Sequence, residues 1–127
     1  MNVVDSSAWL EYFADGPNAG EFAEVIADVE ELVVPSVTLF EVFKRIRVQR
    51  DLASALYAVA QMRRGRVVDL DADLAVAAAE LSAETGLPMA DSIILATARA
   101  EEATLWTQGG DFEGMEAVEY RASVGST

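Results

Sequence analysis

Residues 87–112, LPMADSIILATARAEEATLWTQGGDF, decide the fold that this sequence predicts. The segment indicates a helix, then a short apolar strand, TLW, and then a glycine-rich acidic loop. Parallel α/β sheets bind ligands at the carboxyl ends of their strands, where such a loop would lie. Asp91 shares a helical face with Ile94 and Leu95, and a carboxylate on an apolar face normally shifts its pKa, finds a partner or coordinates a metal ion. The alternative is that Asp91 lies near a helix cap and Asp111 in an ordinary turn.

The same alternation of short strands and helices extends over the rest of the chain. Besides the strand in the opening segment, the pattern predicts strands at residues 2–5, 32–35, 66–70 and 117–120. It predicts helices at residues 8–13, 19–29, 37–49, 51–64 and 71–86. We therefore expect an α/β fold, a three-layer α/β/α sandwich with a mainly parallel sheet of four or five strands. We expect one domain over residues 1–127, with a tail that frays from about residue 121.

The composition narrows the possible chemistry. The 127 residues contain no cysteine and no histidine, which excludes thiol nucleophiles, Ser-His-Asp catalysis and zinc sites built from these residues. An enzyme with this composition would use carboxylates, hydroxyls, Lys or Arg, and oxygen-ligated metals. The net charge of −13 argues against a broadly basic nucleic-acid surface. The N-terminus does not resemble a secretory signal and no apolar run is long enough to span a membrane, so we expect a cytoplasmic protein.

Two further acids stand at defined places in the pattern. Asp5 ends the first predicted strand, so its carboxylate would lie at the carboxyl edge of the sheet. Ser6 and Ser7 follow it and can cap the next helix; alternatively, Asp5 only starts that helix. Glu41 lies in the helix at residues 37–49 with apolar neighbours on most sides. It either faces a site or extends outward into solvent.

Taken together, these segments make the sequence resemble a PIN domain, and within that family a VapC-type toxin of bacterial or archaeal toxin–antitoxin pairs. The resemblance covers essentially the whole chain, because its pieces occur in the family's order and spacing. They are VVDSSAWLEYF (residues 3–13), SVTLFEVFKR (36–45), LPMADSIILATA (87–98) and LWTQGGDF (105–112).

The resemblance implies a Mg²⁺- or Mn²⁺-dependent endoribonuclease in which Asp5, Glu41, Asp91 and Asp111 are the catalytic and metal-binding acids. It also implies a cognate antitoxin, an RNA substrate and a homodimer. The chain departs from the family at Gly109, where an acid or Asn is usual, and Asp111 occupies the next position that the family often fills with an acid or His. Such a site has a weakened fourth corner.

Two sets of supporting residues accompany the acids. Ser6 and Thr107 match hydroxyl positions near the family's metal site, where they would orient acids or water. The alternative for Ser6 is a helix cap. Seven of the nine basic residues lie between 44 and 66, and Lys44, Arg45 and Arg47 are the candidates for substrate binding. The alternative for this basic patch is a solvated helical face.

Two other functions remain open. One is a catalytically weak, PIN-like binding module that acts through a protein partner. The other is a metal-dependent DNA nuclease or phosphatase that uses the same acids. The RNA target, the cleavage site and the number of metal ions do not follow from the sequence.

Overall fold

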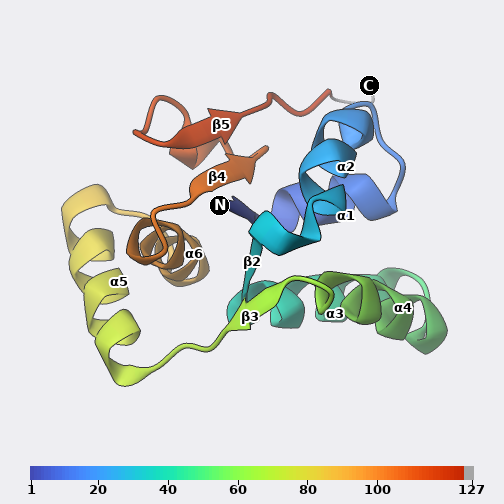
Figure 1. The fold of residues 1–127 in the computed structure, drawn as a ribbon, viewed down its shortest axis with the longest axis horizontal. Coiled ribbons are helices and arrows are strands. Elements are labelled where there is room, and N and C mark those ends of the chain that lie inside the picture. The colour runs from blue at the N-terminus through green and yellow to red at the C-terminus, as the bar shows by residue number, and fades with distance from the viewer. Residues whose placement is uncertain (125–127) are drawn as a thin grey trace.

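The structure is a computed structural model that describes residues 1–124, and these residues form a five-stranded sheet between two layers of helices (Figure 1). The strand order is β3-β2-β1-β4-β5, and every neighbouring pair is parallel. The strands are β1 (Asn2–Val4), β2 (Leu32–Pro35), β3 (Arg66–Val68), β4 (Thr104–Thr107) and β5 (Val118–Tyr120). The predicted α/β/α sandwich with a mainly parallel sheet is therefore confirmed.

Six α-helices connect the strands within residues 1–124. They are α1 (Ser6–Phe13), α2 (Ala19–Ala27), α3 (Ser36–Gln49), α4 (Leu52–Met62), α5 (Ala72–Thr85) and α6 (Met89–Ala100). Short 3₁₀ turns, η1 (Val29–Glu31) and η2 (Gly110–Phe112), precede β2 and follow β4. No helix in this part of the chain combines the length and apolar character of a membrane span.

The two helical layers cover opposite faces of the sheet (Figure 1). Successive strand residues point to opposite faces, so Val3 packs with α5 and α6, whereas Val4 packs with α1 to α4. Helix α6 is buried along most of its length, from Ser92 to Ala98. Burial on nearly all sides explains why its sequence is a continuous apolar run and not an amphipathic stripe.

The chain adds strands on one side of β1 and then on the other. After β1 it forms β2 and β3 on one side, and it then returns to place β4 and β5 on the opposite side. The order of the sheet thus reverses between β1 and β4. Open α/β sheets bind ligands outside the carboxyl ends of the strands at this switch point.

The segment after β5 is hydrogen-bonded to the sheet at its first residue, Arg121. The Arg121 backbone N–H donates to the carbonyl of Thr107 (2.9 Å), and its guanidinium pairs with Glu21 (2.9 Å). The rest of the predicted frayed tail includes residues 125–127, which lie outside the described residues.

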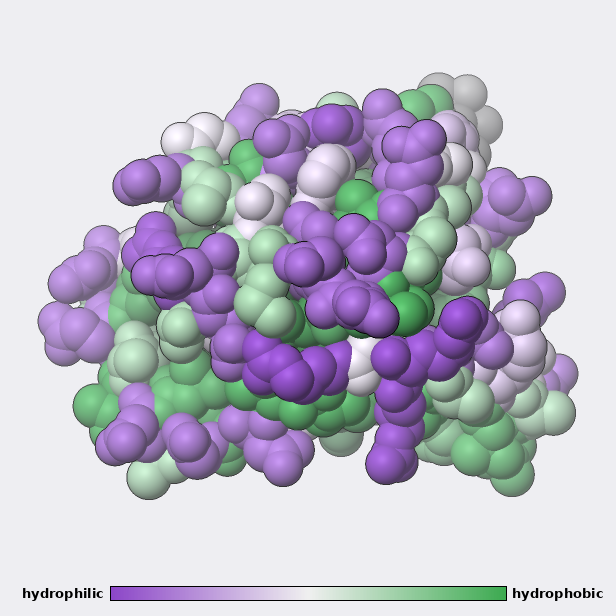
Figure 2. All heavy atoms as spheres, in the orientation of Figure 1, coloured by the Kyte–Doolittle hydropathy of each residue, from purple (hydrophilic) through white to green (hydrophobic). Residues whose placement is uncertain are grey.

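Much of the surface in Figure 2 is hydrophilic, but an apolar area remains over the α3–α4 hairpin. Side chains that a core would normally bury are exposed there: Phe40 (65%), Val48 (74%), Leu52 (49%), Leu56 (54%) and Tyr57 (63%). Apolar surface gathered in one place is typical of a protein contact.

Candidate active site

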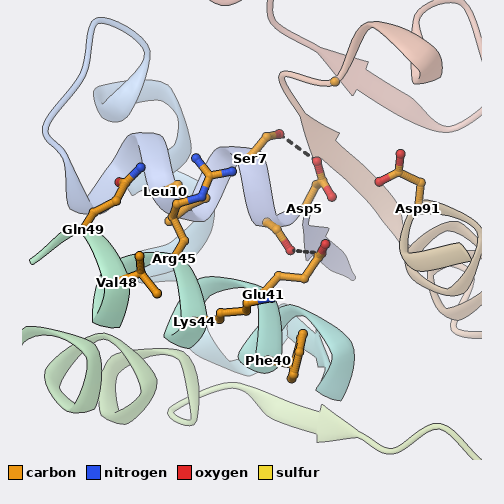
Figure 3. A pocket seen from close by; sticks show the side chains of 12 residues that line it. Asp5, Ser7, Leu10, Phe40, Glu41, Lys44, Arg45, Val48, Gln49 and Asp91 are labelled. Carbon is orange, nitrogen blue, oxygen red and sulfur yellow. Dashed lines mark hydrogen bonds between the residues drawn. The ribbon is translucent and has the colours of Figure 1, made fainter. Parts of the chain in front are cut away.

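A cavity of about 730 Å³ opens at the switch point of the sheet (Figure 3). Its walls come from the end of β1, from α1, from α3, from the start of α6 and from the loop after β4. Asp5, Glu41 and Asp91 all line it, although they are far apart in the sequence. We call this cavity the acid pocket.

Asp5 is held rigidly at the floor of the acid pocket. Its backbone N–H donates to the carbonyl of Trp106 (2.9 Å), which extends the pairing of β1 with β4, and the residue is only 4% exposed. Its Oδ2 accepts hydrogen bonds from the hydroxyls of Ser7 (2.7 Å) and Thr107 (2.8 Å). A buried carboxylate needs such donors, and these two come from opposite sides of the strand switch.

Glu41 reaches the pocket from α3, and a second serine holds it. The Ser6 hydroxyl donates to Glu41 Oε1 over 2.6 Å (Figure 3). The prediction that Ser6 or Ser7 caps the first helix is therefore wrong. Helix α1 begins at Ser6 itself, Asp5 occupies the N-cap position, and there is no side-chain cap hydrogen bond. In a cap the serine oxygen accepts a backbone N–H, whereas here both hydroxyls donate to a carboxylate, and hydrogen bonds to a charged acceptor are stronger than neutral ones.

Asp91 approaches from the other side of the pocket, in the first turn of α6 (Figure 3). Its carboxylate has no hydrogen bond to any of residues 1–124. Burial, and then the negative charges of Asp5, Glu41 and Asp111, raise the pKa of Asp91 to about 6. The three predicted core acids therefore share one local environment, in which adding another negative charge is unfavourable.

Asp111 and Gly109 lie in the loop after β4, beside the acid pocket. Asp111 lies in η2 and is exposed, and it does not line the acid pocket, but its charge contributes to the raised pKa of Asp91. Gly109 does line the pocket. A Cβ at Gly109 would lie 3.2 Å from the Phe112 ring and 3.3 Å from the Thr107 hydroxyl. The position usually filled by an acid in the family is thus crowded here, although its φ of −76° suits any residue.

The donor set fits a hard divalent cation. No three acids among residues 1–124 stand close enough together to form a ready-made metal site. However, Mg²⁺ is commonly held by one or two carboxylates, with waters and substrate phosphate completing its coordination. Carboxylates are the oxygen donors it prefers, and a cation would neutralise the charges of Asp5, Glu41 and Asp111, which add to the effect of burial on the pKa of Asp91.

The basic residues between 44 and 66 do not form one patch. Lys44 and Arg45 line the acid pocket. Arg47 instead lines an apolar groove between α3 and α4, beside Phe43 and Val59. Arg66 pairs with Glu101 (2.7 Å) at the other end of the sheet. The candidates for contact with a substrate in the acid pocket are thus Lys44 and Arg45.

Ser7 and Gln108 are the polar residues whose role the sequence did not reveal. Ser7 donates to Asp5 and accepts the backbone N–H of Gln108 (3.0 Å), while Thr107 accepts the N–H of Gly109 (2.8 Å). The loop after β4 is thereby tied to the carboxylate of Asp5. A serine two residues after a strand-end acid was the available signal, but it is equally typical of a helix cap.

Known structures share this fold over nearly the whole chain. A toxin–antitoxin complex from Klebsiella pneumoniae has a TM-score of 0.81 at 22% identity, covering 98% of this chain and 100% of that one. VapC20 from Mycobacterium tuberculosis, a toxin that cleaves the sarcin–ricin loop, has a TM-score of 0.79 at 22% identity, covering 95% and 99%. VapBC2 from Rickettsia felis, bound to a promoter DNA fragment, has a TM-score of 0.73 at 16% identity, covering 95% and 97%.

No curated protein matches the chain. At these identities the similar structures show the fold alone. The sequence profile of the PIN domain, however, matches residues 3–118, from β1 into β5. The chain therefore belongs to the PIN-domain family.

Proposed function

We propose that this protein is a metal-dependent endoribonuclease that acts as the toxin of a toxin–antitoxin pair. The observation that carries the proposal is the convergence of Asp5, Glu41 and Asp91 on one pocket at the switch point of a PIN-domain sheet. The similarity of the fold to VapC20 and to toxin–antitoxin complexes supports the assignment.

Asp5, Glu41 and Asp91 would hold Mg²⁺ or Mn²⁺, and Asp111 would contribute through its charge or through bound water. Nucleases of the PIN family generally use divalent metals. When bound, such a cation supplies Lewis acidity, which activates water and stabilises the leaving oxygen of a phosphodiester. The absence of histidine from the chain makes this the simplest route to hydrolysis.

The protein's own groups would position the reactants. Ser7 and Thr107 keep the Asp5 carboxylate in place, and Ser6 does the same for Glu41. The cationic groups of Lys44 and Arg45 line the same pocket and would bind the phosphate beside the cleaved bond. Fixed donors of this kind lower the reorganisation that the reaction requires.

The proposed protein partners are a cognate antitoxin and a second copy of the chain. The antitoxin would block the acid pocket with a peptide segment, and the cytoplasm is where an RNA-cleaving toxin would meet its target. The exposed apolar side chains of the α3–α4 hairpin, among them Phe40 and Leu56, provide surface for a protein contact.

Two observations favour the alternative of a binding module with little activity. Gly109 stands where the family usually has an acid or Asn, and no three acids of residues 1–124 are preassembled around a metal position. This alternative predicts that the protein binds its partner but does not hydrolyse nucleic acid.

Cleavage assays with single-stranded RNA and with DNA of the same sequence test these functions. We expect RNA cleavage with Mg²⁺ or Mn²⁺, none in EDTA, and none by the Asp5→Asn variant. Metal-dependent cleavage of DNA instead would indicate a DNA nuclease. Metal binding, seen as a rise in Tm, without cleavage of either polymer would support the binding module.

A further inference from the structure

Two more pockets continue from the acid pocket along α1, α3 and α4. The second, of about 700 Å³, shares Ser7, Arg45 and Gln49 with the acid pocket. The third, of about 360 Å³, shares Phe13 and Arg50 with the second. The three pockets thus form a continuous path with an arginine at each junction, Arg45 at the first and Arg50 at the second. We call the second and third pockets the arginine track.

We propose that the arginine track binds the nucleotides that flank the cleaved phosphate on one side in single-stranded RNA. The proposal rests on the proposed function, because the track would bind the part of the RNA that extends from the acid pocket on one side. A strand of RNA repeats phosphate and base at a fixed interval, and the track repeats a cationic group and a pocket in the same alternation.

The two arginines are available to bind phosphate. Both are exposed, and neither forms an ion pair with residues 1–124. Asp51 follows Arg50 in the chain, and its carboxylate accepts the backbone N–H of Ser54 (2.7 Å). This hydrogen bond, more than the charges of Arg50 and Arg47, lowers the pKa of Asp51. The planar guanidinium group binds phosphate oxygens in pairs, so each arginine can hold one phosphate of the strand.

The second pocket suits a nucleoside better than a bare anion, because its charges are mixed. Glu11 and Asp15 line it together with the arginines. Glu11 Oε2 already accepts the backbone N–H of Asn18 (2.8 Å), which ties this carboxylate to the turn after α1. The remaining carboxylate oxygens can accept hydrogen bonds from a ribose hydroxyl or a base amino group.

Gln108 offers the complementary donor in the same pocket. Its Oε1 accepts from Asn18 Nδ2 (2.6 Å), and Asn18 also donates to the carbonyl of Ala122 (3.0 Å). The amide is therefore held in one orientation, and within residues 1–124 its NH₂ group has no acceptor and is left to donate. Because the Gln108 backbone binds Ser7, which in turn binds Asp5, the base contact is fixed relative to the proposed catalytic centre.

The third pocket carries aromatic surface. It is lined by Phe13 and Tyr57 as well as Arg50, and Tyr57 is 63% exposed. Unpaired bases stack on exposed aromatic rings, whereas base pairs in a duplex cannot. The order of acids, arginine, amide, arginine and aromatic ring favours single-stranded RNA over a polypeptide, for which the apolar groove beside Arg47 is the better-matched surface.

The test compares the binding of randomised single-stranded RNA pools of two to six nucleotides by fluorescence anisotropy. All variants carry Asp91→Asn, so that cleavage does not deplete the probe. We expect affinity to rise with length, and Arg50→Gln to remove most of that gain, about tenfold for the longest pool, while dinucleotide binding changes little. The slope of log affinity against log salt should fall by about 0.7, the amount for one phosphate contact on a single strand. Tyr57→Ala should weaken only the longer pools, also by about tenfold.

Arg63→Gln is the matched control, because it removes the same charge as Arg50→Gln. Arg63 is exposed at the end of α4 and lies outside the three pockets. Unchanged length dependence in both Arg50→Gln and Tyr57→Ala would overturn the track and leave these pockets to a polypeptide partner. The proposed function is judged separately, by cleavage in the protein without Asp91→Asn. If that protein cleaves no RNA while Arg50→Gln still abolishes the length dependence, the proposed nuclease function is wrong, but the proposed binding of RNA by the arginine track is supported.

Discussion

The two halves of the acid pocket are built differently. On the β1–α3 half, hydroxyl groups hold both acids, since Ser7 and Thr107 donate to Asp5 and Ser6 donates to Glu41. On the α6–η2 half, neither Asp91 nor Asp111 has a side-chain hydrogen bond within residues 1–124. We call the β1–α3 half the fixed half, because hydrogen bonds hold its carboxylates before any ligand binds. We call the α6–η2 half the free half, because only the backbone holds its acids in place.

This difference explains why the pKa of Asp91, in the free half, is raised. The pKa of Asp91 rises to about 6 because it is partly buried and faces the other acids without a donor of its own. We infer that cation binding would draw Asp91 toward the fixed pair, and that the fixed half sets the geometry while the free half adapts.

The largest effect should come from the free half. Replacing Asp91 by Asn keeps its shape but removes the charge that would hold a cation, so RNA cleavage should fall by more than about 100-fold, since loss of even an outer-shell partner costs 10–100-fold. The rise of Tm with Mg²⁺ or Mn²⁺ should also disappear.

Asp73→Asn is the control, because Asp73 is likewise an acid in the first turn of a helix, but it is exposed and outside the pocket. An Asp91→Asn variant with full activity and a normal metal shift would reduce Asp91 to a helix-start residue. A loss of about 3–5 kcal/mol in stability would instead indicate a buried structural ion pair.

Breaking the fixed half should have the next largest effect. Thr107→Val preserves the side-chain shape but leaves the buried Asp5 Oδ2 with one donor fewer and removes the acceptor of the Gly109 N–H. We expect a loss of about 1–3 kcal/mol in the free energy of unfolding and a 10- to 100-fold loss of activity. Urea unfolding and cleavage kinetics would measure the two. Thr104→Val is the control on the same strand: Thr104 does not line the acid pocket, so this change should leave cleavage unchanged.

The comparison also predicts a pH dependence in metal-free protein. In the unfolded chain the Asp91 pKa would return to about its ordinary 3.8, whereas in the folded state it is about 6. The folded state therefore binds the extra proton between these values, and the stability from this group is present below about pH 4 and lost as the pH rises through 6. Asp91→Asn lacks this loss, so the variant should become more stable relative to the wild type from pH 4 to pH 7. Parallel urea titrations in EDTA measure that difference, and a difference that does not change with pH would contradict the raised pKa.

The smallest effect should come from placing an acid at position 109, where the PIN-domain family usually has an acid or Asn. Gly109→Asp adds a carboxylate at the edge of the pocket, next to the free half. We expect metal affinity to rise several-fold. The metal-free Tm should fall, because repulsion with Asp91 increases and the added Cβ crowds Phe112 and Thr107. Gly110→Asp is the control, since a Cβ there meets nothing within 4 Å and the residue does not line the pocket. Equal effects of the two variants would mean that only net charge matters.

The sequence predicted the layers and element order because burial imposes strong periodicities. The apolar run of α6 and the short strands NVV and LVVP are typical of elements covered on most sides. The convergence of Asp5, Glu41 and Asp91 was also predicted, from an acid at a strand end, one among apolar neighbours within a helix and one near a helix start. The family resemblance added their proposed roles.

Other features depend on tertiary contacts that no local pattern encodes. Ser6 and Ser7 have the sequence of a helix cap, and only the proximity of Glu41 and Asp5 explains why their hydroxyls point elsewhere. The predicted basic patch divides because α3 turns Arg45 and Arg47 to different pockets. Strand β3 ends at Val68, two residues earlier than predicted, since its parallel pairing with β2 stops at Pro35.

The pairing of β1 with β4 also determines when the acid pocket can form during synthesis. Asp5 is translated about a hundred residues before its donor Thr107 and its backbone partner Trp106. Until β4 inserts beside β1, the Asp5 carboxylate lacks one of its two hydroxyl donors and α6 has no completed sheet to cover. Contacts between such distant segments form late in folding. A nascent chain would therefore carry Asp5, Glu41 and Asp91 without the acid pocket until Thr107 has been synthesised and β4 has paired with β1.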